Sequence, residues 1–468
     1  MMNEKQTLKQ LLETSEGKKI LFLGHKGIFT DREIGRFLKK FKVSMTREYE
    51  EGLAAVVEYH RLNPVEEDIS NMVYDTGIPL YKLVEFEKLL SEKINDDELL
   101  MGIKLSNDQE RILRILGNEH ISDALFVKLL KMYVFDEEEE DNRDDRNVIM
   151  YTLRRYIDIK PSEEDLLYSY LTLRRLATEA TDPDLLNALT GFPNFEFLVR
   201  GKEKITLRET IARNPAIDEP LVRKLLAFRD LKIDQALASN PSVSLEVLKE
   251  LSLKKNEGIE KALATNSAID DEVFGALLER DESVIALLLL WQPINPSRLE
   301  QIERMGISED LYAILGANET LESDVVLKLL EKEEPMLLEA LSGNRTIQPD
   351  ILAEIYQKDE VRYFGHLARN PSVPVWILQT FYEEFMDDES IMTALAYNAS
   401  TPEKILKELF DRDLFEINRG LATNASLPLE LLDILKVDTR LQNELAQNEN
   451  LVNSYEQVLN QDKVMMNV

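Results

Sequence analysis

Leu367-Ala368-Arg369-Asn370-Pro371-Ser372-Val373 is one copy of a phrase that recurs along roughly the last 260 residues of a 468-residue chain. The phrase returns every 26 residues, with one interval of 28 and one of 24 near the end, and its asparagine is its most constant member. One step, at Gln292, keeps the spacing and loses the asparagine. A fixed period of this length is the signature of an array of repeated structural units. The repeat-turn asparagines are Asn214, Asn240, Asn266, Asn318, Asn344, Asn370, Asn398, Asn424 and Asn448.

Two kinds of residue precede each asparagine. The residue three positions earlier is always a branched apolar one, such as Leu367, which predicts a core position. The residue two positions earlier is small in every copy except Leu290, for example Gly316 or Ser342, so we expect backbones to approach closely there. The asparagine is predicted to cap the end of a short helix, because it tolerates left-handed dihedrals and the proline that often follows cannot continue a helix.

The residues after the asparagine predict a second helix. Apolar residues follow at three, seven, eight and eleven positions, as in Val373, Ile377, Leu378 and Phe381, and this spacing gives one apolar stripe. Each unit is therefore predicted to be a short helix, an asparagine turn and a longer helix, and neighbours must stack to bury both stripes. Residues suited to the N-cap or the first turn of the second helix are Asp218, Ser244, Asp270, Pro374, Pro402 and Pro428.

This pattern resembles the leucine-rich repeat variant family, whose units carry a Leu-Ala-Arg-Asn-Pro phrase, and it is broadly similar to HEAT-type repeats. The resemblance covers ten consecutive units and implies a mainly α fold, a right-handed α-solenoid of ~26-residue helical repeats. It implies no particular activity. Founding members of the family carry an N-terminal iron–sulfur domain, which a chain without cysteine cannot form.

Residues 17–95 have a different pattern. Ile20-Leu21-Phe22-Leu23 is a short apolar run that ends at Gly24, and Thr30 with Glu33 forms a capping box at the start of an amphipathic segment. Alternating strands and helices predict a small α/β domain with parallel strand pairing. The further strands are expected at 53–57 and 78–81, and the further helices at 66–74 and 85–90.

The end of this segment resembles a BRCT domain of the kind carried by bacterial DNA ligases. The resemblance rests on Gly77-Ile78-Pro79-Leu80, on the following Glu85-Phe86-Glu87-Lys88-Leu89-Leu90, and on Thr30-Asp31-Arg32-Glu33 at the start of the first helix. Members of that family often bind phosphopeptides or DNA ends through a hydroxyl residue, the backbone of a glycine and a lysine. The resemblance therefore implies a small α/β BRCT-like domain in front of the repeats.

This chain departs from the family pattern at the expected phosphate pocket. Leu23 stands at the hydroxyl position, and Glu66 and Glu67 stand near the position of the lysine, so a phosphate pocket is weakened. Candidate anion-binding residues remain at the strand-to-helix loop, where an ordinary solvated loop is the alternative. They are Gly24, His25 and Lys26.

Three residues just before a repeat turn are candidates for recognition, because the repeat leaves that position free: Trp291, Arg369 and Tyr397. The unit that contains Trp291 also has Glu300 and Glu303 where apolar residues are expected. This irregularity predicts a kink, a recognition site centred on Trp291, or simply a decayed repeat.

The middle of the chain reads as an irregular helical region with degenerate repeats. Eight of the eleven residues from Asp136 to Arg146 are acidic, but the glycine and final glutamate of a calcium loop are absent, so a solvated loop is predicted. The expected order is an N-terminal helical extension (1–16), the BRCT-like domain (17–95), the irregular region (96–204), the repeat array (205–460) and a tail (461–468).

The amino-acid composition limits which binding partners and which metal or catalytic sites the chain can have. The 87 acidic and 56 basic residues give a net charge of −31, which repels nucleic-acid phosphates and favours a basic or extended protein partner, or serves only to keep a long chain in solution. The absence of cysteine excludes disulfides, thiolate metal sites and a cysteine nucleophile. The polar N-terminus and the short longest apolar run, Val284 to Trp291, predict no signal peptide and no membrane helix, so a cytoplasmic location is expected.

The sequence points to no active site. Its four histidines, His25, His60, His120 and His366, have no metal-ligand spacing, and no phosphate-loop or dinucleotide motif is present. We therefore expect a non-enzymatic protein-binding scaffold or adaptor, without metal or cofactor, that uses the repeat surface and the BRCT-like module. The alternative is a DNA-associated repair or replication protein of the HEAT-like DNA-binding or glycosylase type, which would need a basic face.

Overall fold

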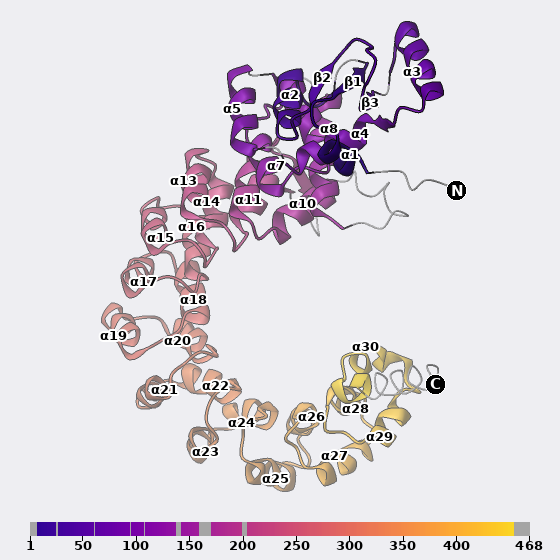
Figure 1. Ribbon diagram of the computed structural model, residues 1–468. Helices are drawn as coiled ribbons and strands as arrows, with labels where there is room; N and C mark the ends of the chain where they lie inside the picture. The colour runs from indigo at the N-terminus through magenta and orange to yellow at the C-terminus, as the bar shows by residue number, and fades with distance from the viewer. Residues whose placement is uncertain are drawn as a thin grey trace. The chain divides into compact units, whose positions relative to one another are not determined.

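The computed structural model describes residues 7–24, 27–59, 61–93, 95–106, 108–136, 142–158, 170–198 and 204–453. The chain is mainly helical and contains a small parallel sheet, in agreement with the expected fold class at this coarse level. It divides into two compact units, a first unit Met1–Arg229 and a second unit Asp230–Val468 (Figure 1).

The first unit begins with a four-stranded parallel sheet of order β2-β1-β3-β4. Its strands are β1 (Lys19–Leu23), β2 (Ser44–Thr46), β3 (Ala55–Glu58) and β4 (Leu80–Lys82), and its helices are α1 (Leu8–Thr14), α2 (Asp31–Lys39), α3 (Pro64–Thr76) and α4 (Leu83–Ser91). Leu21 in β1 pairs with Thr46 of β2 on one side and Val56 of β3 on the other. The predicted parallel pairing is confirmed, and β2 is a strand that the sequence did not predict.

Local signals set the ends of the crossover helices. Thr30 and Glu33 form the predicted capping box at the start of α2. Asn63 and Glu66 form a second capping box at the start of α3, and Gly77 ends this helix with a φ of 74°. A positive φ suits glycine because it has no side chain to clash with the backbone.

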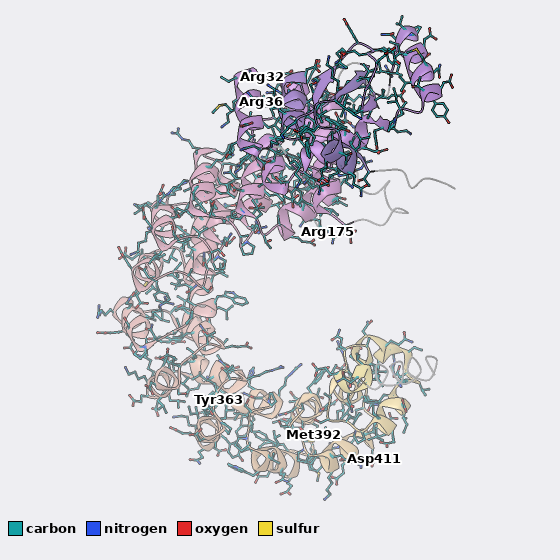
Figure 2. All side chains as sticks on the ribbon, in the orientation of Figure 1. Arg32, Arg36, Arg175, Tyr363, Met392 and Asp411 are labelled. Carbon is teal, nitrogen blue, oxygen red and sulfur yellow. The ribbon has the colours of Figure 1, made fainter. Side chains whose placement is uncertain are left out.

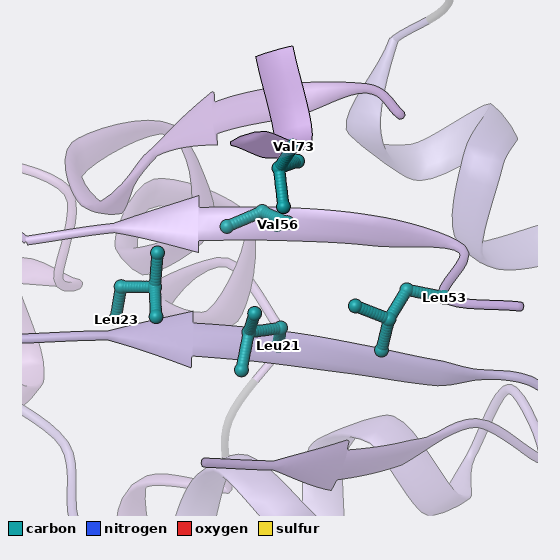
Figure 3. Packing of buried hydrophobic residues seen from close by; sticks show 5 residues of the cluster. All are labelled: Leu21, Leu23, Leu53, Val56 and Val73. Carbon is teal, nitrogen blue, oxygen red and sulfur yellow. The ribbon is translucent and has the colours of Figure 1, made fainter. Parts of the chain in front are cut away.

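The two faces of the sheet are packed differently. Phe22 meets Phe86 of α4 edge to face, with ring centroids 5.0 Å apart. Because side chains alternate along a strand, Leu21 and Leu23 face the other side. On that side α3 supplies only one fully buried residue, Val73. The buried cluster there, shown in Figure 3, consists of Leu21, Leu23, Leu53, Val56 and Val73.

The remainder of the first unit is helical apart from one hairpin. Phe197 pairs with Ile205 in this antiparallel hairpin, which the sequence did not predict. The elements are α5 (Asp96–Ser106), α6 (Gln109–Leu116), α7 (Asp123–Leu130), α8 (Arg143–Tyr156), α10 (Tyr170–Glu179), α11 (Pro183–Leu189), β5 (Glu196–Leu198), β6 (Lys204–Thr206), α12 (Leu207–Ala212) and α13 (Glu219–Ala227). Residues 137–141 of the acidic stretch lie outside the described residues, and α8 begins at Arg143, so the end of that stretch is helical rather than a loop.

The second unit consists of successive helical pairs. Its even-numbered helices are α14 (Leu231–Ala238), α16 (Glu257–Ala264), α18 (Glu282–Trp291), α20 (Glu309–Gly316), α22 (Pro335–Gly343), α24 (Val361–Arg369), α26 (Glu389–Tyr397), α28 (Phe415–Thr423) and α30 (Gln442–Leu445). Its odd-numbered helices are α15 (Leu245–Ser252), α17 (Asp271–Leu278), α19 (Pro296–Met305), α21 (Ser323–Leu330), α23 (Pro349–Gln357), α25 (Val375–Glu384), α27 (Glu403–Phe410) and α29 (Leu429–Leu435), followed by the 3₁₀ helix η2 (Thr439–Leu441).

These helices form two layers within the second unit. Each even-numbered helix packs against the next even-numbered one, and we call this row of helices the first layer; the odd-numbered helices form the second layer (Figure 1). The apolar stripe predicted for the second helix of each pair is buried, as Ile377, Leu378 and Phe381 of α25 show. Tyr363 of α24 and Met392 of α26, both labelled in Figure 2, are also buried, on neighbouring first-layer helices.

Two predictions about the repeat are wrong in detail. In the second unit the two helices that flank a repeat asparagine have similar lengths, and α22 and α23, on either side of Asn344, both have 9 residues. The asparagines are not left-handed, because Asn370 has a φ of −80° and a ψ of 118°. Left-handed residues occur instead at the opposite turn, between the second helix of one pair and the first helix of the next: Arg229, Lys255, Glu333, Asp359 and Asp413.

The small residue predicted two positions before the asparagine does mark a close approach in α20. A Cβ added to Gly316 would lie 2.9 Å from the Cβ of Ala340 and 2.9 Å from the carbonyl oxygen of Leu337 in α22. A Cβ added to Gly365 in α24 would meet no atom within 4 Å. These two helical glycines therefore form a matched pair for substitution by alanine.

We expect Gly316→Ala to lower the free energy of unfolding by about 1–2 kcal/mol, because overpacking of α20 against α22 outweighs the gain in helix propensity. Gly365→Ala is expected to raise it by about 0.5–1 kcal/mol, because only the gain in helix propensity applies. Urea unfolding of the two variants measures both effects. Equal effects of the two substitutions would contradict the close approach at Gly316.

Candidate functional site

A continuous row of side-chain amides runs through the second unit. The side-chain amide of Asn370 donates to the backbone carbonyl of Asn344, one repeat earlier, at 2.9 Å, and Asn398 donates to the carbonyl of Asn370 at 2.9 Å. The same bond recurs along the unit with distances of 2.8 to 3.2 Å. We call this row the amide ladder. Its donors are Asn266, Gln292, Asn318, Asn344, Asn370, Asn398, Asn424 and Asn448.

Each ladder amide is buried and makes further hydrogen bonds. Asn370 is 2% exposed and also donates to the carbonyl of Ser342 at 2.9 Å, while its side-chain oxygen accepts from the backbone N–H of Ser372 at 2.9 Å. An extended backbone at Asn370 aims the amide at the preceding unit, which a left-handed backbone would not do. The asparagine thus joins two successive repeats and also closes its own turn.

A row of hydroxyl groups runs beside the ladder. Ser372, Ser400 and Ser426 donate to the carbonyls of Arg345, Pro371 and Ala399 in the preceding unit, at 2.5 to 2.6 Å. These residues stand two positions after a ladder asparagine. The recurring serine or threonine at that position is the sequence signal that could have predicted this row.

Gln292 takes the place of an asparagine in the ladder. Its side-chain amide donates to the carbonyls of Ala264 and Asn266 at 2.9 and 2.8 Å, which are the bonds that an asparagine makes elsewhere. The turn is one residue shorter here, because the buried apolar residue is Ile294, two positions after Gln292 rather than three. The longer glutamine side chain fits this shorter turn.

The second helix of the Gln292 unit keeps its buried stripe. Leu299 and Ile302 are buried, one residue before the positions where the period places Glu300 and Glu303. Arg298 fills the shorter turn. Its guanidinium donates to the carbonyls of Ile269 and Pro293 at 3.0 and 2.9 Å. The apolar stripe is therefore shifted by one residue and not lost, which explains why Glu300 and Glu303 stand where apolar residues are expected.

Related amides occur in the first unit. Asn214 is buried and donates to the carbonyls of Ala177, Thr178 and Ala180 at 2.9 to 3.1 Å. Asn118 is also buried, and its amide donates to the hydroxyl of Ser91 at the end of α4, at 2.8 Å. The irregular helical region thus bonds directly to the α/β segment. Asn240, at the start of the second unit, is buried and offers its carbonyl to Asn266.

The candidate recognition residues lie on the surface beside the ladder. Trp291 is 61% exposed at the end of α18. The guanidinium carbon of Arg369 lies 4.3 Å from the ring centroid of Tyr397, so the repeat brings together two residues that stand at equivalent positions in successive units. The row is completed by small or polar residues: Ser239, Thr265, Ala317, Gly343 and Thr423. The residue type in this surface row varies along the second unit, whereas the ladder beside it is nearly constant.

The candidate anion site at Gly24 is filled by the chain itself. The N–H of Gly24 donates to a carboxylate oxygen of Glu66 at 3.0 Å, and the other oxygen of Glu66 accepts from the N–H of Asn63 at 2.9 Å. Arg47 donates to the carbonyl of Gly24 at 2.7 Å. His25 and Lys26, the other two candidates, lie outside the described residues. The Gly24 backbone is therefore not available to a phosphate in this arrangement.

The titratable side chains around the loop after β1 form contacts that hold the loop in place. The N–H of Ile28 donates to the carboxylate of Glu87 at 2.7 Å. Burial raises the pKa of the Tyr59 hydroxyl, and the nearby guanidinium of Arg47 acts in the opposite direction. A Cβ at Gly24 would lie 2.6 Å from the Cβ of Tyr59, so only glycine fits at the end of β1.

The described residues contain no group of three or more His, Asp or Glu side chains that could hold a metal ion. His366 approaches Glu339 at 3.2 Å on the surface, and His60 lies outside the described residues. A cavity of about 450 Å³ is lined by Leu116, Phe126, Tyr151 and Arg155, among others, but Arg155 is held by Asp123 at 2.6 Å. No helix in the described residues is long and apolar enough to cross a membrane.

Comparison with known proteins gives no assignment. No family model matches this chain, and neither the curated proteins nor the solved structures include a significant match.

Proposed function

We propose that the chain is a non-enzymatic protein-binding scaffold built as a right-handed α-solenoid of ~26-residue repeats, preceded by a BRCT-like α/β domain. Support for the solenoid comes from the helical pairs of the second unit, each bonded to the next by a ladder amide. Support for the BRCT-like domain comes from the parallel four-stranded sheet with crossover helices.

The observation that carries the functional proposal is the contrast between two neighbouring rows. The polar side chains that recur in every unit, the ladder amides, are buried and are used to join units. The residues immediately before them lie at the surface; Trp291 and Arg369 are exposed and Tyr397 is half-buried. Exposed aromatic and arginine side chains are typical of binding hot spots. A repeat whose constant residues are structural and whose variable residues are exposed is suited to recognising an extended partner.

The BRCT-like domain is proposed as a docking module that does not read phosphate. The N–H of Gly24 already donates to the carboxylate of Glu66, and the net charge of −31 repels a phosphate group. The same charge argues against a nucleic-acid function for the whole chain.

The test combines capture of partners with two tryptophan variants. Proteins captured from native cells by the full chain are purified and titrated against it by calorimetry. We expect at least one to bind with a Kd of about 10 µM or tighter, and Trp291→Ala to weaken that binding at least about tenfold. Trp376→Ala is the matched control, because Trp376 is 49% exposed on α25 of the second layer.

Duplex DNA is titrated in parallel at physiological salt. We expect no measurable binding, because the chain carries a net charge of −31. A sub-micromolar and steeply salt-dependent affinity for DNA, together with no protein partner, would replace the scaffold with a DNA-associated protein.

A further inference from the structure

Three arginines in the second unit stand out because, among the described residues, their guanidinium groups have neither a carboxylate partner nor a hydrogen bond. Arg412 also lacks a carboxylate, but its guanidinium donates to the carbonyl of Met386 at 2.7 Å. Arg280, Arg298, Arg304, Arg419 and Arg440 each form an ion pair with a carboxylate. Within the described residues, no carboxylate lies within 4.0 Å of the side chains of Arg345, Arg362 or Arg369. The chain has 87 acidic and 56 basic residues, so guanidinium groups without a carboxylate partner are available to the carboxylates of another molecule.

These three arginines belong to one part of the surface. Arg362 and Arg369 lie on α24 with His366 between them, and the spacing of four and three residues places all three exposed side chains on one face of the helix. Arg345 follows Asn344, whose carbonyl accepts the amide of Asn370 at 2.9 Å. Arg345 and Arg369 therefore flank the same rung of the ladder. We call Arg345, Arg362, His366, Arg369 and Tyr397 the α24 patch.

The patch offers open backbone between its charged groups. Gly365 lies on the same face of α24, and a Cβ added to it would meet no atom within 4 Å. Gly343, on the neighbouring helix α22, is exposed, and a Cβ added to it would lie 3.4 Å from Nδ1 of His366. Tyr397 lies under the guanidinium of Arg369 and holds it in place at 4.3 Å. The one carboxylate that an ion pair brings to the patch is Glu339, which approaches His366 at 3.2 Å.

We propose that the α24 patch docks an acidic segment of a partner protein, whose carboxylates pair with Arg345, Arg362 and Arg369. This inference rests on the proposed scaffold function and gives it a partner chemistry. The overall charge of the chain favours a basic partner, but unpaired guanidinium groups bind carboxylates, and bidentate pairing makes arginine well suited to that task. A short acidic segment fits the patch better than a nucleic acid, because duplex DNA carries one charge every ~1.7 Å and meets the repulsion of the whole chain.

The experiment uses the full chain and a fluorescein-labelled peptide of alternating glutamate and alanine, with the peptide of alternating glutamine and alanine as the uncharged control. At about 20 mM ionic strength, where surface charges are weakly screened, we expect the glutamate peptide to bind and the glutamine peptide not to bind. The variant R345A/R362A/R369A should bind the glutamate peptide at least about tenfold more weakly, as expected for the loss of three exposed ion pairs.

A matched variant, R304A/R419A/R440A, removes three exposed arginines that are already paired with carboxylates in the same unit. It has the same net charge as the first variant and should bind the glutamate peptide like the wild-type chain. Equal weakening by both variants, or no binding of the glutamate peptide to the wild-type chain, would overturn the assignment. Duplex DNA that binds more tightly than the peptide and depends on the same three arginines would also overturn it.

The captured partner proteins separate the two proposals. If partners bind the wild-type chain and R345A/R362A/R369A equally well, the acidic docking site is wrong and the scaffold stands. If no protein binds the wild-type chain, the scaffold itself is wrong.

Discussion

Replacement of Asn370 by leucine is expected to lower the free energy of unfolding by about 2–5 kcal/mol, because it leaves several buried backbone groups without a hydrogen bond. The carbonyls of Ser342 and Asn344 lose a donor, and the N–H of Ser372 loses its acceptor. Each unsatisfied buried group costs about 1–3 kcal/mol, and partial relaxation of the turn keeps the sum below three full penalties. Leucine has the same branching and the same number of side-chain heavy atoms as asparagine, so the substitution leaves no cavity and removes the hydrogen bonds.

Urea unfolding followed by far-UV circular dichroism and tryptophan fluorescence measures the effect of Asn370→Leu. Trp376 lies in α25, directly after this turn, and Trp291→Phe removes the only other tryptophan signal. Arg345→Ala is the control, because an exposed side chain in the adjoining turn should change the stability by no more than about 0.5 kcal/mol. A stability of the leucine variant within that range would show that the amide contributes nothing.

Replacement of Arg298 by methionine is expected to cost about 2–4 kcal/mol, even though methionine retains most of the aliphatic stem. Arg298 is 6% exposed, and its hydrogen bonds join two successive repeats. Its Nε lies 2.7 Å from a carboxylate oxygen of Asp271, and its other nitrogens satisfy the carbonyls of Ile269 and Pro293. Its guanidinium also contacts the side-chain oxygen of Gln292 at 3.3 Å, where an asparagine turn uses a backbone N–H.

Arg304→Ala is the matched control for this substitution. Arg304 lies on the same helix and pairs with Glu300, but its side chain is 71% exposed, so its loss should cost less than about 0.5 kcal/mol. Thermal unfolding of both variants gives the comparison. Similar melting temperatures for the two variants would mean that the guanidinium of Arg298 does not support the shortened turn.

The sequence was sufficient to predict the periodic part of the fold. The leucine or isoleucine three positions before each asparagine is buried in every described unit, as Leu237, Leu315 and Leu421 illustrate. The reason is physical: an apolar spacing of three and four residues can only be buried by a helix packed on a neighbour. Thr30 and Glu33 begin a helix and Gly77 ends one through contacts within a few residues. These helix ends could therefore also be predicted from the sequence.

Features that depend on contacts one repeat apart could not be predicted in this way. Asn370 has an extended backbone because its amide reaches the preceding unit, whereas its intrinsic preference suggested a left-handed cap. Gln292 looked like a lost asparagine because its compensation comes from a shorter turn and from Arg298. In both cases the partner of the side chain is far away in the sequence.

In the candidate binding sites, too, contacts between residues far apart in the sequence could not be predicted. Trp291, Arg369 and Tyr397 were singled out because the repeat leaves their position free, and the stacking of Arg369 on Tyr397 follows from their separation by one repeat. The pairing of Gly24 with Glu66 joins residues 42 positions apart, and it removes an anion site that local sequence left open. The unpaired guanidinium groups of the α24 patch emerge only when the partners of the other arginines in the second unit are known.

The most direct test of the amide ladder is hydrogen exchange of the wild-type chain and the Asn370→Leu variant under native conditions. The ladder predicts faster exchange in the two turns that Asn370 joins, residues 342–346 and 370–374, and no change in the opposite turn around Asp359. Unchanged exchange in both joined turns, or an equal increase at Asp359, would contradict the claim that the buried asparagine amides hold successive units together.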